Sequence, residues 1–263
     1  MELFPIPAHV TAEFCFDDAV ETVGREWAVL TWNIQGSKST DLARVADVIA
    51  AESPDVVALQ EVRRPQAADL ADRLSMSSVW NEKHHPWRPL FPSKAEGAAL
   101  LSPHTLSDTN HAAVSDVSSR RNYRRRILQR ALVERADGSA YRVFNLHLSP
   151  HDMHEARRNE ATRISAIARS LSDSPPTIIA GDLNDHGSSE MITLLPGIEA
   201  IAPPPTNPSH APTDCIDHVL VPPAASAVSV SVPAGGTEWA ELSDHLPLTV
   251  RFTLDWVQVG SGS

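Results

Sequence analysis

The sequence predicts an α/β protein in which mixed sheets pack face to face and helices cover their outer faces. Short apolar runs typical of buried strands alternate along the chain with segments of helical spacing. A hairpin signal, Asp137-Gly138, stands between two such runs, which indicates antiparallel pairs beside parallel ones. Elements of this kind bury their apolar faces by stacking in layers.

The first half of the chain begins with a strand, helix and strand. Residues 27–32 form a short β-prone run, and residues 56–59 form an apolar run of the buried-strand type. Between them, residues 42–51 place apolar side chains at helical spacing. A second helix is expected at 67–74 and a further strand at 98–102.

The second half begins with the hairpin, whose strands cover residues 127–134 and 141–148. An amphipathic helix follows at 155–171. The remaining expected elements are a strand at 177–180, a short helix at 188–195 and two strands at 215–221 and 246–254. Six prolines in the segment 196–212 predict a loop there, because proline cannot donate a backbone hydrogen bond.

The 263 residues fit one large domain or two small ones. Residues 1–26 hold six acidic residues and one arginine and show no sustained period, so we predict an acidic N-terminal extension. The folded domain is expected at 27–255 and a flexible tail at 256–263. The extension is also the segment that we expect to bind a protein partner, if the chain has one.

Charge and composition exclude several classes of protein. A formal net charge of −11 argues against a nonspecific coat for nucleic acid or anionic membrane, although a local basic groove is compatible with it. The longest uncharged stretch, 219–237, contains three prolines and cannot form a membrane-spanning helix of about 20 apolar residues. The N-terminus lacks a secretory pattern, so we expect a cytoplasmic protein whose two cysteines are thiols without a catalytic role.

Polar side chains stand at the ends of six strand-like runs. Each run finishes in, or leads into, a carboxylate, an amide or an imidazole, and strand ends are where sheet proteins assemble their sites. Together they indicate an oxygen-ligand metal site with acid–base chemistry around it. The six positions are Trp32-Asn33, Gln60-Glu61, Asn145-Leu146-His147, Asp182-Leu183-Asn184, Asp217-His218 and Asp244-His245.

These segments, in this order, resemble the motifs of the endonuclease/exonuclease/phosphatase superfamily, the DNase I-like phosphodiesterases. The resemblance covers about residues 27–253, and the six motifs together are far more specific than any one of them. It implies a four-layered α/β sandwich with two central mixed sheets flanked by helices. The motifs are Thr31-Trp32-Asn33-Ile34-Gln35-Gly36, Leu59-Gln60-Glu61-Val62, Asn145-Leu146-His147-Leu148, Gly181-Asp182-Leu183-Asn184, Ile216-Asp217-His218-Val219 and Ser243-Asp244-His245-Leu246-Pro247.

The resemblance implies a divalent metal, Mg²⁺ or Mn²⁺, which prefer oxygen ligands. Glu61 is the expected ligand carboxylate. Asn33 is expected to give its amide oxygen to the metal or to hold the scissile phosphate. Asp244 matches a family acid near the metal, as a direct or water-mediated ligand. The alternative for Glu61 is a strand-end acid paired with Arg63 or Arg64.

The resemblance also implies the catalytic groups. Asp182 is expected to orient and deprotonate the attacking water, and Asn184 to donate an amide hydrogen to a phosphate oxygen. Asp217 and His245 are expected to pair, so that the imidazole stabilises charge in the transition state. His147 is the second imidazole, which protonates the leaving oxygen or binds the phosphate. The alternative for Asp182 and Asn184 is a turn-forming pair.

The substrate must be inferred from features outside these motifs, because one fold serves many substrates. Arg63 and Arg64 follow Glu61, in a region where the resemblance implies an arginine that contacts DNA. Residues 120–130 hold six arginines and no acid, so Arg124, Arg126 and Arg130 are expected to share a strand face that contacts phosphates. We therefore expect an endonuclease acting on DNA rather than RNA. The alternative for these arginines is a solvated basic strand edge that discourages aggregation. The abasic-site endonucleases of the family usually have an acidic residue where this chain has Gln35, and a tyrosine-containing motif where it has Asn145-Leu146-His147-Leu148. Both differences argue against an abasic-site endonuclease.

Two alternatives stay open. A phosphatase or a phospholipase C-type phosphodiesterase acting on lipid, inositol-phosphate or other small phosphoesters uses the same residues. A binding subunit without activity is a different class, and the presence of every catalytic side chain named above argues against it.

Overall fold

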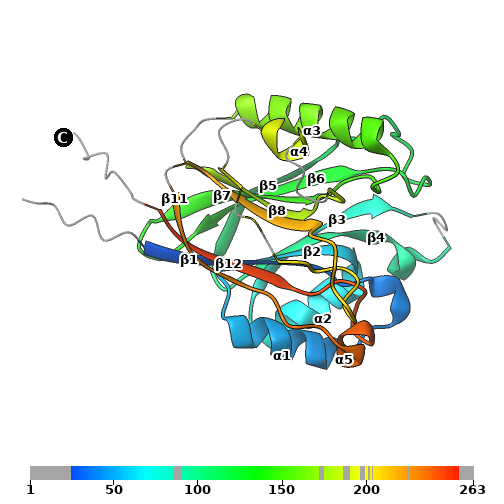
Figure 1. Ribbon diagram of the computed structural model, residues 1–263, viewed down its shortest axis with the longest axis horizontal. Coiled ribbons are helices and arrows are strands. Elements are labelled where there is room, and N and C mark those ends of the chain that lie inside the picture. The colour runs from blue at the N-terminus through cyan, green and yellow to red at the C-terminus, as the bar shows by residue number, and fades with distance from the viewer. Residues whose placement is uncertain are drawn as a thin grey trace, which may run out of the picture.

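The computed structural model of the chain describes residues 25–85, 90–171, 175–185, 190–195, 199–200, 202, 204–223 and 225–254. Two six-stranded sheets pack face to face, with helices on both outer sides (Figure 1). This confirms the predicted four-layered sandwich. Nearly all of the predicted extension 1–26 and the whole tail 256–263 lie outside the described residues. None of the helices described is long and apolar enough to cross a lipid bilayer.

The first sheet carries the predicted βαβ start of the domain. Strands β1 and β2 run parallel, and the other neighbours are antiparallel. Its strands, in spatial order, are β11 (Ala225–Ser231), β12 (Leu248–Leu254), β1 (Arg25–Asn33), β2 (Val56–Arg63), β4 (Glu96–Ser102) and β3 (Ser77–His84). The helical elements that follow its strands are α1 (Leu42–Glu52), α2 (Arg64–Leu74), α5 (Thr237–Ala240) and the 3-10 turns η1 (Gly36–Lys38) and η2 (Pro92–Lys94).

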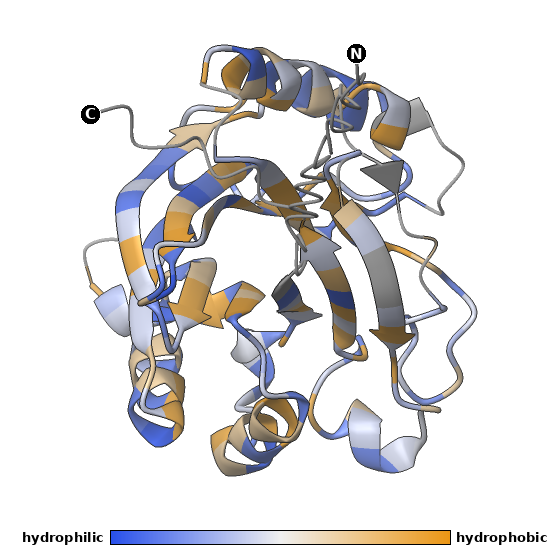
Figure 2. Ribbon diagram, turned by 90° about the vertical axis from the view of Figure 1, so that its left-hand side faces the viewer, coloured by the Kyte–Doolittle hydropathy of each residue, from blue (hydrophilic) through white to orange (hydrophobic). Residues whose placement is uncertain are grey.

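The second sheet contains the predicted hairpin, β6 and β7. Strands β7 and β8 run parallel and are joined through helix α3 (His154–Arg169), which covers the outer face with the short α4 (Glu190–Thr193). The strands, in spatial order, are β5 (Thr105–Ala113), β6 (Ile127–Glu134), β7 (Ala140–His147), β8 (Thr177–Asp182), β10 (Asp217–Val221) and β9 (Glu199–Ala200). Figure 2 shows the helices above and below the two sheets.

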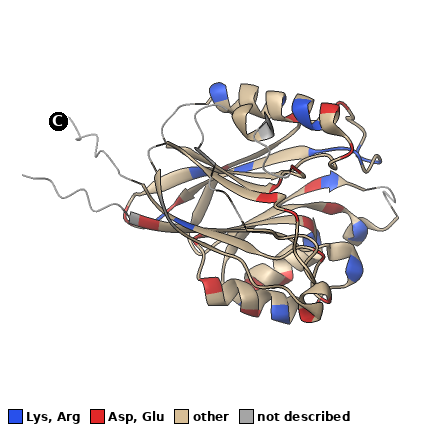
Figure 3. Ribbon diagram, viewed as in Figure 1, with Lys and Arg blue, Asp and Glu red and all other residues tan. Residues whose placement is uncertain are grey.

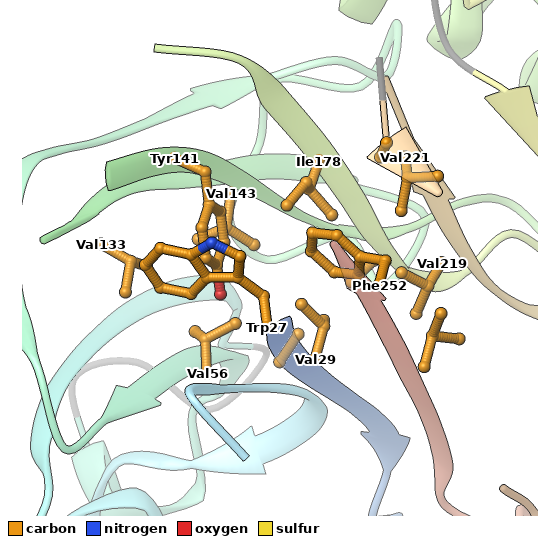
Figure 4. Packing of buried hydrophobic residues seen from close by; sticks show 14 of the residues in the cluster. Trp27, Val29, Val56, Val133, Tyr141, Val143, Ile178, Val219, Val221 and Phe252 are labelled. Atoms are coloured by element: carbon orange, nitrogen blue, oxygen red, sulfur yellow. The ribbon is translucent and has the colours of Figure 1, made fainter. Parts of the chain in front are cut away.

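Aromatic side chains fill the space between the sheets. The rings of Trp27 and Tyr141 meet edge to face with centroids 4.6 Å apart, and Phe252 lies 6.3 Å from Tyr141 (Figure 4). All three are fully buried. Aromatic pairs of this geometry are stabilising beyond the area that they bury, so these rings help to hold the two sheets together.

Four strands were not predicted, and they are the four sheet edges: β3, β5, β9 and β11. The predicted loop 196–212 is therefore wrong at Glu199–Ala200, where β9 pairs with β10. Edge strands lie half in solvent and carry polar side chains that discourage pairing with other chains. Strand β5, for example, is mostly exposed or half-exposed along its length, so it lacks the alternation of apolar residues from which strands are predicted.

Candidate active site

Strand alternation directs the polar motif residues into the space between the sheets. Side chains two apart on a strand share a face. Trp27 and Val29 of β1 lie in the core between the sheets, whereas Leu30 and Trp32 pack with the helices. The same alternation on β2, β7, β8 and β10 places a set of polar residues toward the opposite sheet at one end of the sandwich: Asn33, Gln60, Asn145, His147, Asp182 and Asp217.

Asp182 lies at the centre of this set. Strand register places His147 on one neighbouring strand and Asp217 on the other directly beside it. From the other sheet, the Asn33 side chain donates a hydrogen bond to Asp182 Oδ2 at 3.2 Å. His147 Nε2 lies 3.6 Å from the same oxygen, and His245 Nε2 lies 3.8 Å from it. Four of the predicted residues thus surround one buried carboxylate.

The environment of Asp182 shifts its protonation toward neutral pH. Burial disfavours its charged form, and the nearby Asp217 carboxylate adds to this. The charge of His245 and the hydrogen bonds from Asn33 and from the Asn184 backbone oppose the shift but do not cancel it, and the pKa of Asp182 rises to about 7. A carboxylate with this pKa can accept and release a proton near neutral pH.

His245 and Asp217 form the predicted pair. His245 Nδ1 lies 2.8 Å from Asp217 Oδ2, and the Thr206 hydroxyl donates to the same oxygen at 2.6 Å. Burial opposes protonation of His245, but the charges of Asp217 and the neighbouring carboxylates outweigh it and raise the pKa of His245 to about 10. The ring is therefore an imidazolium at neutral pH, held by a carboxylate on one side and facing Asp182 on the other.

His147 has the opposite electrostatics. Its burial, followed by the nearby charges of Lys83 and Arg126, lowers the pKa of His147 well below its usual value. At neutral pH this imidazole is uncharged and can donate a single hydrogen bond. Among the described residues its buried Nδ1 has no hydrogen-bond partner, and Glu61 Oε1 lies 4.0 Å from it.

Glu61 sits on a backbone irregularity rather than in the regular strand. The pairing of β2 with β4 shifts between Leu59 and Val62, and Glu61 has a left-handed φ of 52°. Such conformations in non-glycine residues are costly and cluster at functional sites. Gly36 makes the close approach possible, because a Cβ there would lie 2.6 Å from the Glu61 carbonyl oxygen. The bulge turns the Glu61 carboxylate toward the site.

The donors around Glu61 fit a divalent metal. Burial raises the pKa of Glu61, and the charges of Glu96 and Asp244 add to this, while those of Lys83 and His245 oppose it without cancelling it. The ionised carboxylate is therefore unfavourable in the metal-free fold, and a bound cation would stabilise it. The Gln35 side chain donates to Asp244 Oδ2 at 3.1 Å, while its own buried Oε1 has no partner among the described residues. The carboxylate oxygens of Glu61 and Asp244 and the Gln35 Oε1 atom are all oxygen ligand atoms, which suit Mg²⁺ or Mn²⁺. Asn33, the third predicted ligand, lies on the neighbouring strand β1, and its Oδ1 accepts a hydrogen bond from the Gln35 backbone at 3.1 Å.

A second cluster, Asp182, Asp217 and His245, brings three ligand atoms within 4.8 Å of one another. The Asp217 oxygen and the His245 nitrogen that face each other already form a hydrogen bond of 2.8 Å. Asp217 and His245 therefore already pair with each other within this cluster.

Asn184 forms a turn with Asp182, the alternative given for these two residues in the sequence. Its backbone N–H donates to Asp182 Oδ1 at 2.9 Å, and its side chain donates to the Leu148 carbonyl at 3.0 Å. Its φ of 50° is left-handed. The turn therefore orients the Asp182 carboxylate. Because an amide nitrogen carries two hydrogens, one remains for a substrate oxygen.

A family model described as "Endonuclease/Exonuclease/phosphatase family" matches residues 30–245. The chain belongs to the endonuclease/exonuclease/phosphatase family. Members of this family are phosphoester hydrolases, and they generally use divalent metals. No curated protein sequence matches the chain significantly.

Solved structures share this family fold at low sequence identity. An endonuclease/exonuclease/phosphatase from Bacteroides vulgatus has a TM-score of 0.74 at 22% identity, covering 88% of this chain and 99% of its own. A mannosyl-6-phosphatase from Bacteroides thetaiotaomicron gives 0.70 at 16%, covering 86% and 99%. The human Nocturnin catalytic domain gives 0.69 at 19%, covering 86% and 93%. At these identities the likeness shows the fold alone.

The predicted arginine face of this family member is wrong. Strand β6 begins only at Ile127, so Arg124 and Arg126 lie in the turn before it and do not alternate with Arg130 on one strand. Arg124 is exposed, whereas Arg126 is buried. Consecutive arginines lacked the alternation with apolar residues that marks a strand, and the turn takes them in different directions.

Arg63 ends β2 and precedes α2. It is half-buried, and among the described residues its side chain forms no ion pair, so the alternative in which it neutralises Glu61 is not observed. The Gln66 side chain accepts a hydrogen bond from the Arg63 backbone at 2.9 Å and so starts the helix.

Several residues near the family motifs were not predicted to act at the site. Thr206, which fixes Asp217, lies in the proline-rich segment and carries no sequence signal. Ser243 accepts from the His245 backbone at 3.2 Å and donates to the Asn33 carbonyl at 2.6 Å; its place in the Ser243-Asp244-His245 motif was a signal for it. Lys83 forms a buried ion pair with Glu96 on β4.

Proposed function

We propose that this family member is a divalent-metal-dependent nuclease that hydrolyses phosphodiesters, with DNA cut internally. The observation that carries the proposal is the buried Asp182 carboxylate, with a pKa of about 7, between one neutral and one charged imidazole. A base, a hydrogen-bond donor and a fixed positive charge around one point are what in-line attack of water on a phosphodiester requires.

Each side chain has a distinct task in this proposal. Asp182 orients a water molecule and takes its proton. The charged His245 ring, held by Asp217, stabilises the negative charge that grows on the phosphate oxygens. The neutral His147 donates a hydrogen bond to the phosphate or to the leaving oxygen. Asn184 keeps Asp182 in position and donates its remaining amide hydrogen to a phosphate oxygen.

Glu61, Asn33 and Asp244 would hold the metal, Mg²⁺ or Mn²⁺. When bound, the metal neutralises charge on the phosphate and so makes it easier to attack. The raised pKa of the buried Glu61 carboxyl, which a bound cation would lower, supports this assignment.

Nucleic acid is favoured by the basic segment beside the site. Five arginines and no carboxylate lie between Val117 and Arg126 in a chain whose net charge is −11. Contacts to several successive phosphates need such a local concentration of positive charge. The half-buried Arg63 and the exposed Arg124 are the proposed contacts to substrate phosphates on the surface, whereas the buried Arg126 is proposed to act through its charge near His147. A small-phosphoester phosphatase is the second candidate, because a structural relative is named a mannosyl-6-phosphatase.

Cleavage assays test the proposal. Supercoiled plasmid, single-stranded DNA, RNA and bis-p-nitrophenyl phosphate are incubated with protein and Mg²⁺, Mn²⁺ or EDTA. Asp182→Ala and His245→Ala should abolish metal-dependent cutting, whereas Asp72→Ala, an exposed carboxylate on α2, should cut like the wild type. Hydrolysis of a small phosphoester with every nucleic acid left intact would overturn the nuclease and favour the phosphatase.

A further inference from the structure

The large hydrophobic side chains that are exposed lie on two segments of the described chain. Leu90 is 76% exposed and Phe91 49% exposed, and both begin the segment 90–95 that follows β3. Tyr123 is 63% exposed and lies in the segment 117–126 that precedes β6. We call these two segments together the rim. Water-facing apolar side chains confined to one region mark a binding surface.

Hydrogen bonds hold the rim against the end of β3. The His85 backbone N–H donates to the Arg120 carbonyl at 2.6 Å. The buried Arg125 guanidinium donates to the Glu82 carbonyl at 2.9 Å and to the Lys83 carbonyl at 2.6 Å. On the other segment, His85 Nε2 lies 2.8 Å from the Phe91 carbonyl. The two exposed rings are therefore carried by segments fixed to a single strand end.

Each exposed ring has a cation beside it. Lys94 Nζ lies 5.2 Å from the centre of the Phe91 ring, and the Arg124 guanidinium lies 5.7 Å from the centre of the Tyr123 ring. Figure 3 shows basic residues gathered at the end of the molecule to which β3 points. Aromatic rings beside cations are the combination that binds unpaired bases and their phosphates, since rings stack on bases and cations contact the backbone.

The rim adjoins the candidate active site. Arg126 donates to the Tyr123 carbonyl at 3.0 Å, and its charge also contributes to lowering the pKa of His147. His84, at the end of β3, pairs in register with Glu96, whose charge acts on Glu61. A polynucleotide whose phosphate lies between His147 and Glu61 can therefore reach the rim.

A hollow of about 410 Å³ lies beside Phe91, a volume within the range of sites for small ligands. Its wall includes the Trp80 indole, and polar groups of Arg64, Glu82 and His85 surround it. Pro92, Ser93 and Ala95 of the rim close another side. The hollow is thus lined by an aromatic residue and by polar residues, and Pro92, next to Phe91, is part of its wall.

We propose that the rim and this hollow bind unpaired nucleotides next to the scissile phosphodiester, so that the preferred substrate is single-stranded nucleic acid. This rests on the proposed nuclease function and specifies its substrate. Bases in an intact duplex are stacked on each other and their faces cannot reach side chains, whereas unpaired bases can stack on Phe91 and Tyr123. The cations beside both rings match the charge of the nucleic acid backbone.

Binding measured without cleavage tests the proposal. Fluorescence anisotropy in EDTA compares a labelled oligothymidylate with the same strand in a duplex. The single strand should bind more tightly, and Phe91→Ala and Tyr123→Ala should each weaken its binding about 5- to 100-fold through lost stacking. Tyr123→Phe keeps the ring and should bind like the wild type. Arg73→Ala, an exposed cation on α2 away from the rim, is the control for charge.

The outcomes separate this proposal from the function on which it rests. Plasmid cleavage with equal binding of duplex and single strand, or with unaltered binding by both alanine variants, would overturn the rim and leave the nuclease standing. Hydrolysis of bis-p-nitrophenyl phosphate without binding of any nucleic acid would overturn both. Loss of binding to phosphatidylcholine vesicles in the alanine variants, with oligonucleotide binding unchanged, would make the rim a lipid-binding surface instead.

Discussion

The Gln60 side chain donates a hydrogen bond to Asn145 Oδ1 at 2.8 Å, and this contact joins the two sheets directly behind the candidate active site. Both residues are fully buried. The Asn145 amide in turn donates to Gln129 Oε1 at 3.0 Å, which extends the connection to β6. Gln60 directly precedes Glu61, and Asn145 lies two residues before His147. The buried amides thus fix the separation of the strands that carry the metal carboxylate and one imidazole.

Replacing Asn145 with Leu should therefore destabilise the fold. The change removes the amide that donates to Gln129 Oε1 and to the Leu59 and Ala99 carbonyls in a buried setting, which costs about 2–4 kcal/mol of the free energy of unfolding. Gln60 keeps its bonds to Thr31 and Ala58. Urea denaturation measures it. Asn110→Ala, at an exposed position on β5, should change the free energy of unfolding by less than about 0.5 kcal/mol. Equal effects of the two substitutions would contradict a structural role for the amides.

The central strands could be predicted from sequence because their burial on both faces leaves apolar runs such as 56–59 and 177–180. The edge strands could not, because solvent on one side removes the requirement for apolar residues. Strand β5 shows this, since it pairs with β6 over nearly its whole length while most of its side chains face water. Pairing is determined there by the neighbouring strand and not by the side chains of β5 itself.

Asp182→Asn should change how stability depends on pH. The folded pKa of Asp182 is about 7 against an ordinary value of 3.8, so the folded state binds more protons than the unfolded state between these values. The free energy of unfolding contributed by this group therefore falls as pH rises from about 4 to about 7. Urea denaturation in EDTA at several pH values should show this fall in the wild type and not in Asp182→Asn.

The control is Asp72→Asn, a change at an exposed position on α2, which should keep the wild-type pH dependence. Asp182→Asn should also lose about 10²- to 10⁴-fold in the rate of phosphodiester cleavage, the usual contribution of a general base. A variant that keeps both the pH dependence and the rate would exclude Asp182 as the base.

Asp217→Asn should lower the pKa of His245. The Asp217 carboxylate is the main group that raises this pKa to about 10, and burial of the ring acts against it. Without that charge the ring loses its proton at lower pH, and the rate should fall about 10²- to 10⁴-fold at alkaline pH. An NMR titration of the His245 ring checks the pKa directly. Its persistence near 10 in the variant would show that another group holds the proton.

Thr206→Val is the matched variant for this pair. It removes the hydrogen bond of 2.6 Å to Asp217 but keeps the carboxylate charge, so it should shift the pKa of His245 in the same direction by a smaller amount. The contrast separates the effect of the charge from the effect of its orientation.

The site could be predicted where a residue belongs to a motif at a strand end, because strand register alone then brings His147, Asp182 and Asp217 side by side. Thr206 reaches Asp217 from a loop, and loop paths are not encoded in local periodicity. Lys83 lies on β3 and Glu96 on β4, and these two strands become neighbours only in the strand order of the folded first sheet. The effect of Lys83 on the pKa of His147, and of Glu96 on the pKa of Glu61, could therefore be found only from the three-dimensional structure.

Glu61→Gln should have opposite effects on stability with and without metal. Burial and the charges of Glu96 and Asp244 raise the pKa of Glu61, so its ionised form is unfavourable in the metal-free fold and removing the charge should raise the thermal midpoint in EDTA. A bound metal stabilises the folded state in proportion to its affinity, so Mg²⁺ or Mn²⁺ should raise the midpoint of the wild type and have little effect on Glu61→Gln.

Differential scanning fluorimetry measures the thermal midpoint in EDTA and in the presence of metal. Glu155→Gln, an exposed change at the start of α3, should respond like the wild type. A metal-induced shift of the same size in Glu61→Gln would place the ion elsewhere, with the cluster of Asp182, Asp217 and His245 as the next position to test.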